Sequence, residues 1–77
     1  MDSYIATFFS HYDALVFFNY LNEAGITPKL IPVPRRLSSS CGTCVAFEAM
    51  QLPSHNADCE LEAIYKELQG GFLKIWE

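Results

Sequence analysis

The strongest constraint on the fold is a change in apolar spacing at Ser10. Residues 4–9 (YIATFF) are β-branched and aromatic, as is typical of a strand. Beyond Ser10 the apolar residues recur at i, i+3, i+4 and i+7, on one face of a helix. Ser10 stands at the expected N-cap with Asp13 three residues later, and Gly25 is suited to end the helix. We therefore predict a helix over residues 11–24. The apolar residues of this stripe are Ala14, Phe17, Phe18 and Leu21.

Two strand-like segments follow the predicted helix. Residues 27–33 (TPKLIPV) and residues 43–49 (TCVAFEA) are rich in strand-forming residues, and a polar turn over residues 34–42 separates them. Pro28 and Pro32 each lack a backbone donor. We therefore expect the first of these strands to be short or to lie at an edge of the sheet.

The last part of the chain predicts one more helix and one more strand. Residues 57–69 carry an apolar stripe at helical spacing, formed by Leu61, Ile64, Tyr65 and Leu68. Gly70 and Gly71 would end this helix, and residues 72–76 (FLKIW) are typical of a strand. The order β-α-β-β-α-β predicts an α+β fold of the ferredoxin-like type. In that fold two helices cover one face of a four-stranded antiparallel sheet with strand order 4-1-3-2. We expect residues 1–77 to form a single such domain.

Charge and hydropathy exclude several classes of function. Nine Asp and Glu residues against five Lys and Arg residues give a formal net charge of −4. This charge disfavours binding to nucleic acid or to an anionic membrane surface. No apolar run approaches the roughly 20 residues that span a bilayer, and the first residues lack the basic region of a secretory signal peptide. We therefore expect a cytoplasmic protein with no nucleic-acid or membrane partner.

The polar turn has the composition of a reactive-thiol site. Its sequence from residue 34 is PRRLSSSCGTC, in which three serines and a glycine flank Cys41. Short polar residues and a glycine let backbone N–H groups converge on one point, and two arginines bring positive charge to the same turn. Both features favour the thiolate, the form that attacks sulfur or selenium or carries it as a persulfide. The candidate site residues are Cys41, Arg35, Arg36, Ser38, Ser39, Ser40 and Gly42.

Cys41 and Cys44 also form a C-x-x-C pair, which makes Cys44 a candidate resolving thiol. In thioredoxin-like proteins this motif opens a helix, whereas here it precedes a predicted strand. A redox dithiol protein is therefore an alternative to a single-cysteine site. Cys44 is equally explained as a strand residue that faces the core.

A zinc site is a second alternative. Cys41 and Cys44 with His55 and Cys59 give the spacing C-x2-C…H-x3-C, a set of four ligands suited to zinc. Nothing in the sequence forces the two pairs together, and 51% hydrophobic residues can form a core without metal. The phosphate-binding motif G-x-x-x-x-G-K-[ST] is absent from the sequence. We expect no metal and no cofactor.

The same turn also suits an anionic ligand without a covalent step. Arg35, Arg36 and the neighbouring serine hydroxyls can bind phosphate or a carboxylate. In this alternative the chain is a non-enzymatic interaction or regulatory module. An apolar sheet face that no helix covers would need another cover, and a homodimer supplies one.

The chain resembles a family of small bacterial domains of unknown function described as selenium/sulfur carrier protein-like. The resemblance covers nearly the whole chain, and its specific part is the P-R…S-S-x-C-G run that begins at Pro34 and contains Cys41. It implies a non-enzymatic carrier in which Cys41 holds the chalcogen while Arg35 and the serines shape the loop. It further implies a donor such as a cysteine desulfurase and an acceptor protein as partners. Cys44 lies outside the pattern of the family.

Overall fold

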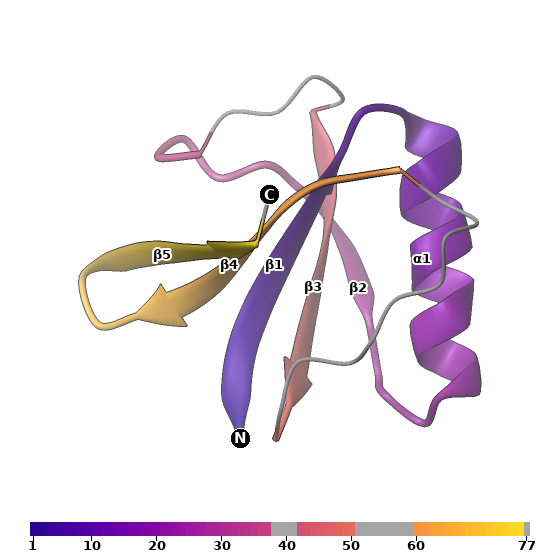
Figure 1. Cartoon of the computed structure of the whole chain (residues 1–77), viewed down its shortest axis with the longest axis horizontal. Coiled ribbons are helices and arrows are strands. Elements are labelled where there is room, and N and C mark those ends of the chain that lie inside the picture. The colour runs from indigo at the N-terminus through magenta and orange to yellow at the C-terminus, as the bar shows by residue number, and fades with distance from the viewer. Residues whose placement is uncertain (38–41, 51–59, 77) are drawn as a thin grey trace.

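The computed structural model describes residues 1–37, 42–50 and 60–76. Within these residues the chain forms one helix and a five-stranded antiparallel sheet (Figure 1). The elements are β1 (Asp2–Phe8), α1 (His11–Glu23), β2 (Lys29–Pro32), β3 (Thr43–Ala49), β4 (Leu61–Leu68) and β5 (Gly71–Trp76). The strand order β2-β3-β1-β4-β5 places β1 in the centre and β2 and β5 at the edges. The α+β class expected from the sequence is confirmed.

Strand β1 is buried on both of its faces. Ala6 and Phe8 lie on the face that α1 covers, whereas Ile5 and Thr7 lie on the other, and all four are buried. Such a strand is stable only in the interior of a sheet, with a partner on each side. The Thr7 hydroxyl donates to Ala63 O at 3.3 Å in neighbouring β4, so this buried polar group is satisfied.

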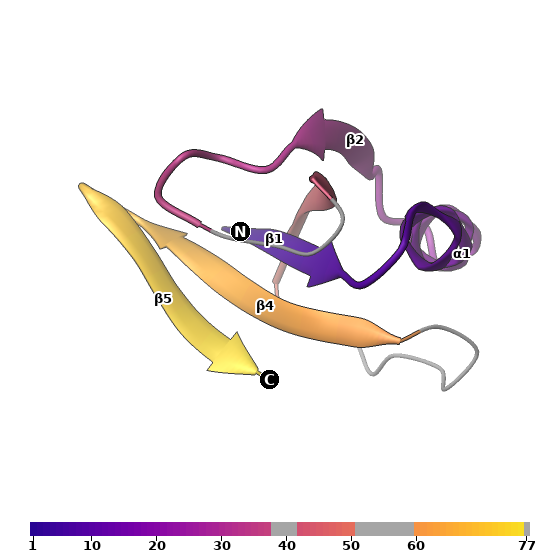
Figure 2. The same cartoon turned by 90° about the horizontal axis from the view of Figure 1, so that it is seen from above.

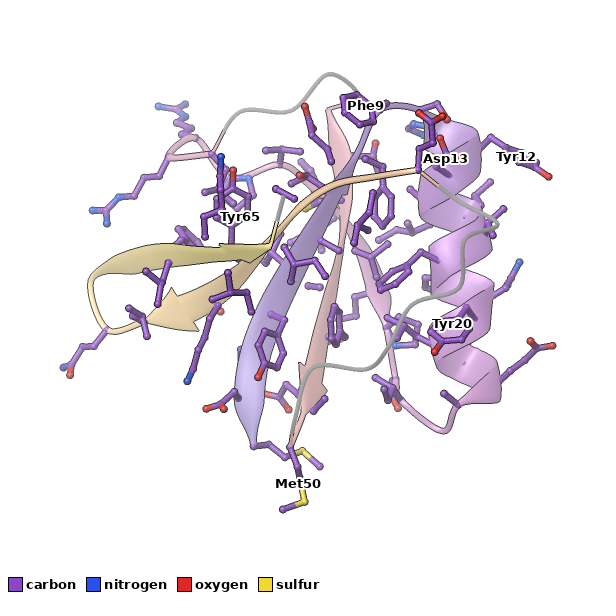
Figure 3. The ribbon with its side chains drawn as sticks, in the orientation of Figure 1. Phe9, Tyr12, Asp13, Tyr20, Met50 and Tyr65 are labelled. Carbon is purple, nitrogen blue, oxygen red and sulfur yellow. The ribbon has the colours of Figure 1, made fainter. Side chains whose placement is uncertain are left out.

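Helix α1 has the caps that the sequence predicts. The Ser10 hydroxyl accepts a hydrogen bond from Asp13 N at 3.2 Å and donates one to the Asp13 carboxylate at 2.7 Å (Figure 3). At the other end Gly25 has a φ of +83°. Ile26 N donates to Leu21 O at 2.9 Å, the outer bond of a Schellman motif. In the described part of the chain no helix is long and apolar enough to cross a membrane.

Helix α1 packs its apolar stripe against one face of the sheet. Ala14, Phe17 and Leu21 are buried there. The Phe17 ring lies 5.3 Å from the Phe8 ring and 5.9 Å from the Phe47 ring, measured between centroids. These tilted and edge-on contacts join the helix to β1 and β3. Seen from above, the helix covers the side of the sheet formed by β1 to β3, and the β4–β5 hairpin extends away from it (Figure 2).

The second predicted helix is wrong. Residues 61–68 form β4, which pairs with β1 on one side and β5 on the other. Ala63 lies on one face of this strand and Ile64 on the other, and both are buried. When apolar residues lie on both faces of a strand, some of them fall at i, i+3 and i+4 in the sequence, which is also the spacing of a helical stripe. The ferredoxin-like arrangement, with four strands in the order 4-1-3-2 and two helices, is therefore replaced by five strands and one helix among the described residues.

The other predicted strands correspond to observed ones. Residues 43–49 coincide with β3, and the predictions for β1, β2 and β5 differ from the observed ends by one or two residues. Strand β2 is short and lies at an edge, as its prolines predict. The chain segment that carries the candidate site connects this short edge strand to β3.

Candidate functional site

The segment between β2 and β3 begins with a tight turn. Leu37 N donates to Pro34 O at 2.9 Å, so Arg35 and Arg36 occupy the two central positions of a β-turn. Both arginine side chains are exposed. Two of the five cations of the chain therefore lie on one solvent-facing turn, close in sequence to Cys41.

Arg36 joins this turn to the β4–β5 hairpin. Its Nη1 donates to Gly70 O, in the turn between the two strands. The same nitrogen lies 3.8 Å from the point where a Cβ on Gly71 would stand. The sequence places both arginines near the thiol but carries no signal for this contact, because the two segments are 34 residues apart and no local pattern relates them. One guanidinium carries five N–H donors, so this bond leaves others for an anion.

Gly42 closes the other end of the loop. Val33 N donates to Gly42 O at 3.2 Å, immediately before the first β2–β3 pair, Pro32 with Thr43. Gly42 has a φ of +77°, in the left-handed region that glycine enters without strain. The residue that follows Cys41 is thus a glycine for a backbone reason, and its predicted part in the site stays a prediction.

The remaining residues of the predicted site lie outside the described residues. They are Ser38, Ser39, Ser40 and Cys41. The described residues bound this segment at Leu37, in the arginine turn, and at Gly42, beside β3. The roles predicted for its three serines and its cysteine stay predictions.

Cys44 is a buried residue of β3. Its exposure is 0%, and the strand register sets it between Ile31 of β2 and Thr7 of β1, on the face opposite α1. Its Sγ lies 3.8 Å from Pro32 O, the distance of a weak hydrogen bond from the thiol. A thiol reacts only where its partner can reach it. Packing within the sheet accounts for Cys44, and its role as a resolving thiol stays a prediction.

The zinc alternative is largely outside the described ranges. Within residues 1–37, 42–50 and 60–76, no group of three or more His, Cys, Asp or Glu side chains is placed to hold a metal ion. Cys41, His55 and Cys59 lie outside those ranges, and Cys44 is buried in β3. The four-ligand site stays a prediction from spacing.

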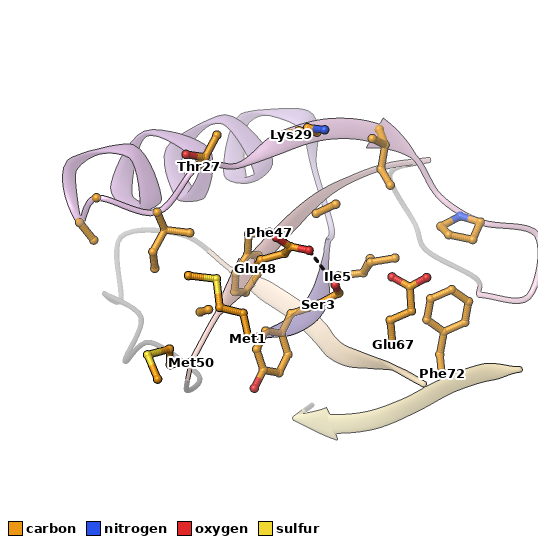
Figure 4. A pocket seen from close by; sticks show the side chains of 18 residues that line it. Met1, Ser3, Ile5, Thr27, Lys29, Phe47, Glu48, Met50, Glu67 and Phe72 are labelled. Carbon is orange, nitrogen blue, oxygen red and sulfur yellow. Dashed lines mark hydrogen bonds between the residues drawn. The ribbon is translucent and has the colours of Figure 1, made fainter. Parts of the chain in front are cut away.

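An open groove of about 960 Å³ lies mainly on the sheet face away from α1 (Figure 4). Ile5, Ala46 and Phe72 contribute apolar walls, and Pro34 connects the groove to the arginine turn. The Ser3 hydroxyl donates to the Glu48 carboxylate at 3.3 Å within it. The charges that face the groove are those of Lys29, Glu48 and Glu67.

The short length of β2 explains the groove. The four residues of β2 pair with the first four residues of β3, so Phe47–Ala49 extend beyond them. The hollow therefore continues around the end of β2, toward the chain that leaves α1. No motif in the sequence indicates the groove directly, although the prolines that shorten β2 are a local signal for it.

Most of the chain, including the loop between β2 and β3, matches a known protein family. Residues 3–75 match the family described as "Putative Se/S carrier protein-like". The chain belongs to this family. The match to the Se/S carrier-like family extends from β1 into β5 and includes the whole turn that carries the arginines and Cys41. It confirms the resemblance seen in the sequence. No curated protein and no solved structure matches the chain.

Proposed function

We propose that this member of the Se/S carrier-like family holds sulfur or selenium on Cys41 and passes it to an acceptor protein. The observation that carries the proposal is the family match over residues 3–75, which includes the loop with its cysteine. The description of the family names a carrier of these two elements, and an exposed pair of arginines stands next to the segment that contains Cys41.

Burial disfavours Cys44 as the carrier thiol. Cys44 is 0% exposed within the sheet, so a donor protein would have to open β3 to reach it. Cys41 belongs instead to a connection whose two ends are held by backbone hydrogen bonds, at Leu37 and at Gly42. Connecting loops carry reactive and binding residues more often than the interiors of strands do.

The proposed transfer conserves atoms and electrons. The Cys41 thiolate attacks the outer sulfur of a persulfide on a donor protein such as a cysteine desulfurase. The sulfur–sulfur bond of the donor breaks, a new one forms on Cys41, and the donor cysteine leaves as a thiolate. No external oxidant or reductant is needed. A nucleophile on the acceptor then takes the outer sulfur and returns Cys41 to its thiolate, and selenium follows the same sequence as a selenopersulfide.

The arginine turn supplies charge to this step. Thiolates and persulfides are both anionic, and Arg35 and Arg36 stand at exposed turn positions within six residues of Cys41 in the sequence. Positive charge nearby favours the ionised sulfur. We assign Arg35 mainly to this electrostatic role, because Arg36 already donates to Gly70 O and also positions the loop.

Intact-protein mass spectrometry tests the proposal. The protein is incubated with a cysteine desulfurase and cysteine, and we expect a gain of one sulfur atom that peptide mapping places on Cys41. Cys41→Ser should abolish the gain, whereas Cys59→Ser and Cys44→Ala should retain it. No gain in the wild-type protein, under conditions in which an established carrier protein gains sulfur, would overturn the proposal.

The exposed arginines also favour a second candidate function. Two guanidinium groups on adjacent turn positions suit a phosphate or carboxylate ligand that is bound without covalent chemistry. A titration with inorganic phosphate, followed by nuclear magnetic resonance, separates this candidate from the carrier. If the chain is an anion-binding module, Cys41→Ser will leave binding intact, and Arg35→Gln with Arg36→Gln will remove it.

A further inference from the structure

The two edges of the sheet differ in how well they are protected. Strand β2 has four residues, ends in Pro32 and follows Pro28, and such short proline-containing strands resist pairing with another chain. Strand β5 has six residues and contains no proline. In the part of the chain that the structure describes, β5 pairs with β4 alone. Among the described strands, one edge of the sheet is therefore protected against further pairing, and the other is open.

An apolar surface adjoins the open edge. Leu68 of β4 is 45% exposed, and Leu73 and Ile75 of β5 are 51% and 37% exposed. The register joins Leu73 to Lys66 and Lys66 to Tyr4, which places Leu73 on the sheet face that α1 covers elsewhere. Helix α1 packs on β1, β2 and β3, and Leu61 and Ile64 of β4 belong to the same buried core. Among the described elements, the uncovered part of that face is therefore the Leu68 end of β4 and the adjoining β5, in the hairpin that extends away from the helix (Figure 2).

We propose that two copies of the chain pair antiparallel through β5, about a two-fold axis at Leu73. The pairing extends the sheet continuously across the dimer and brings the exposed leucines and isoleucines of both copies together. A sheet with one open edge closes after a single pairing, because each copy then presents only its protected β2 edge. A second copy of the chain therefore fits this edge better than a different protein, because the same strand supplies both sides of the pairing.

The charges on β5 favour this register. With the axis at Leu73, Lys74 of one copy stands opposite Phe72 of the other, so the two ammonium groups are not opposed across the ladder. An axis at Lys74 would place like charges directly opposite each other. Lys74 Nζ already lies 5.7 Å from the centroid of the Tyr65 ring in its own chain, and the register places both residues on the face away from Leu73. The dimer does not depend on the chemistry at Cys41.

Sedimentation equilibrium tests the dimer. The wild-type protein should have twice the monomer mass at high concentration and dissociate on dilution, because a pairing through one six-residue strand forms a small interface. Leu73→Lys should give the monomer mass throughout, since it places two ammonium groups at the axis. Leu15→Lys is the matched control, because Leu15 is 45% exposed but lies on α1, and this variant should dimerise like the wild type.

A symmetric disulfide tests the register. Residues directly opposite in an antiparallel pair have Cα atoms about 4.5–5.5 Å apart, within the range that a disulfide spans. In a Cys41→Ser, Cys59→Ser background, Leu73→Cys should form a covalent dimer under mild oxidation, and Leu15→Cys should not. Circular dichroism verifies that each variant is folded. A wild-type protein that stays monomeric at millimolar concentration would overturn the proposal, as would a Leu73→Lys variant that dimerises like the wild type.

Discussion

Replacing Gly42 by alanine should destabilise the protein through backbone conformation alone. Gly42 has a φ of +77°, and no described heavy atom outside its chain neighbours lies within 4 Å of a Cβ built on it. The cost is therefore that of a left-handed backbone for an L-residue, about 1–2 kcal/mol. Alanine also removes entropy from the unfolded chain, which offsets roughly half of that cost. We expect a net loss of about 1 kcal/mol, or about 4–8 °C in the melting temperature of a domain of this size.

Thermal unfolding followed by circular dichroism, with a urea titration at one temperature, measures this loss. Gly42→Asn should lose less than Gly42→Ala, because asparagine enters the left-handed region more readily. A smaller loss for asparagine would distinguish a conformational cost from the loss of a contact. The same two variants also show whether a strained residue after Cys41 slows sulfur loading.

Gly71→Ala is the matched control within the same molecule. Gly71 is not among the glycines with positive φ, and its added Cβ would stand 3.8 Å from Arg36 Nη1, an ordinary contact. We expect its stability to change by less than about 0.5 kcal/mol. If Gly71→Ala loses as much stability as Gly42→Ala, or if both Gly42 variants match the wild type, the backbone argument is refuted.

Two further predictions concern the neighbours of the loop. An alkylating reagent should label Cys44 much more slowly in the folded protein than in urea, because the thiol is 0% exposed, and peptide mass spectrometry would reveal equal rates if this is wrong. Arg36→Gln should lower stability by about 0.5–1.5 kcal/mol, because it removes the hydrogen bond to Gly70 O. Arg35→Gln at the adjacent turn position is its control and should change stability by less than about 0.5 kcal/mol; equal losses would assign the effect to charge.

The first half of the fold is predictable because its signals are local. Ser10 accepts from Asp13 N within one turn of chain, and Gly25 ends the helix through its own φ. Each signal acts between residues that are neighbours in the sequence, so it can be read without the tertiary structure. Strand β3 is predicted with its observed ends for the same reason, since a glycine precedes it and strand-forming residues fill it.

Strand β4 was not predictable from apolar spacing, because the same residues satisfy two periods. Leu61, Ile64 and Leu68 share a helical face, yet in the structure a bulge between Leu61 and Ala63 sets Leu61 and Ile64 on the α1 face of a strand. Ala63 is buried on the opposite face. The abundant Leu, Glu and Lys of this segment favour a helix locally. The segment forms a strand instead, because β1 has a second edge that β3 does not pair with, and β4 supplies the hydrogen bonds there. The signal that could have found it is the two-residue connection at 69–70 between apolar segments, which is typical of a hairpin.

The sequence by itself determined the helix and its caps, the short β2 edge, the composition of the loop around Cys41 and the family of the chain. These depend on neighbours in the chain or on residue types alone. Only the tertiary structure decided that Cys44 is buried, that Arg36 donates to Gly70 O, and that β5 is left as the open edge. Each of these depends on segments that are distant in sequence, and only the pairing of strands brings them together.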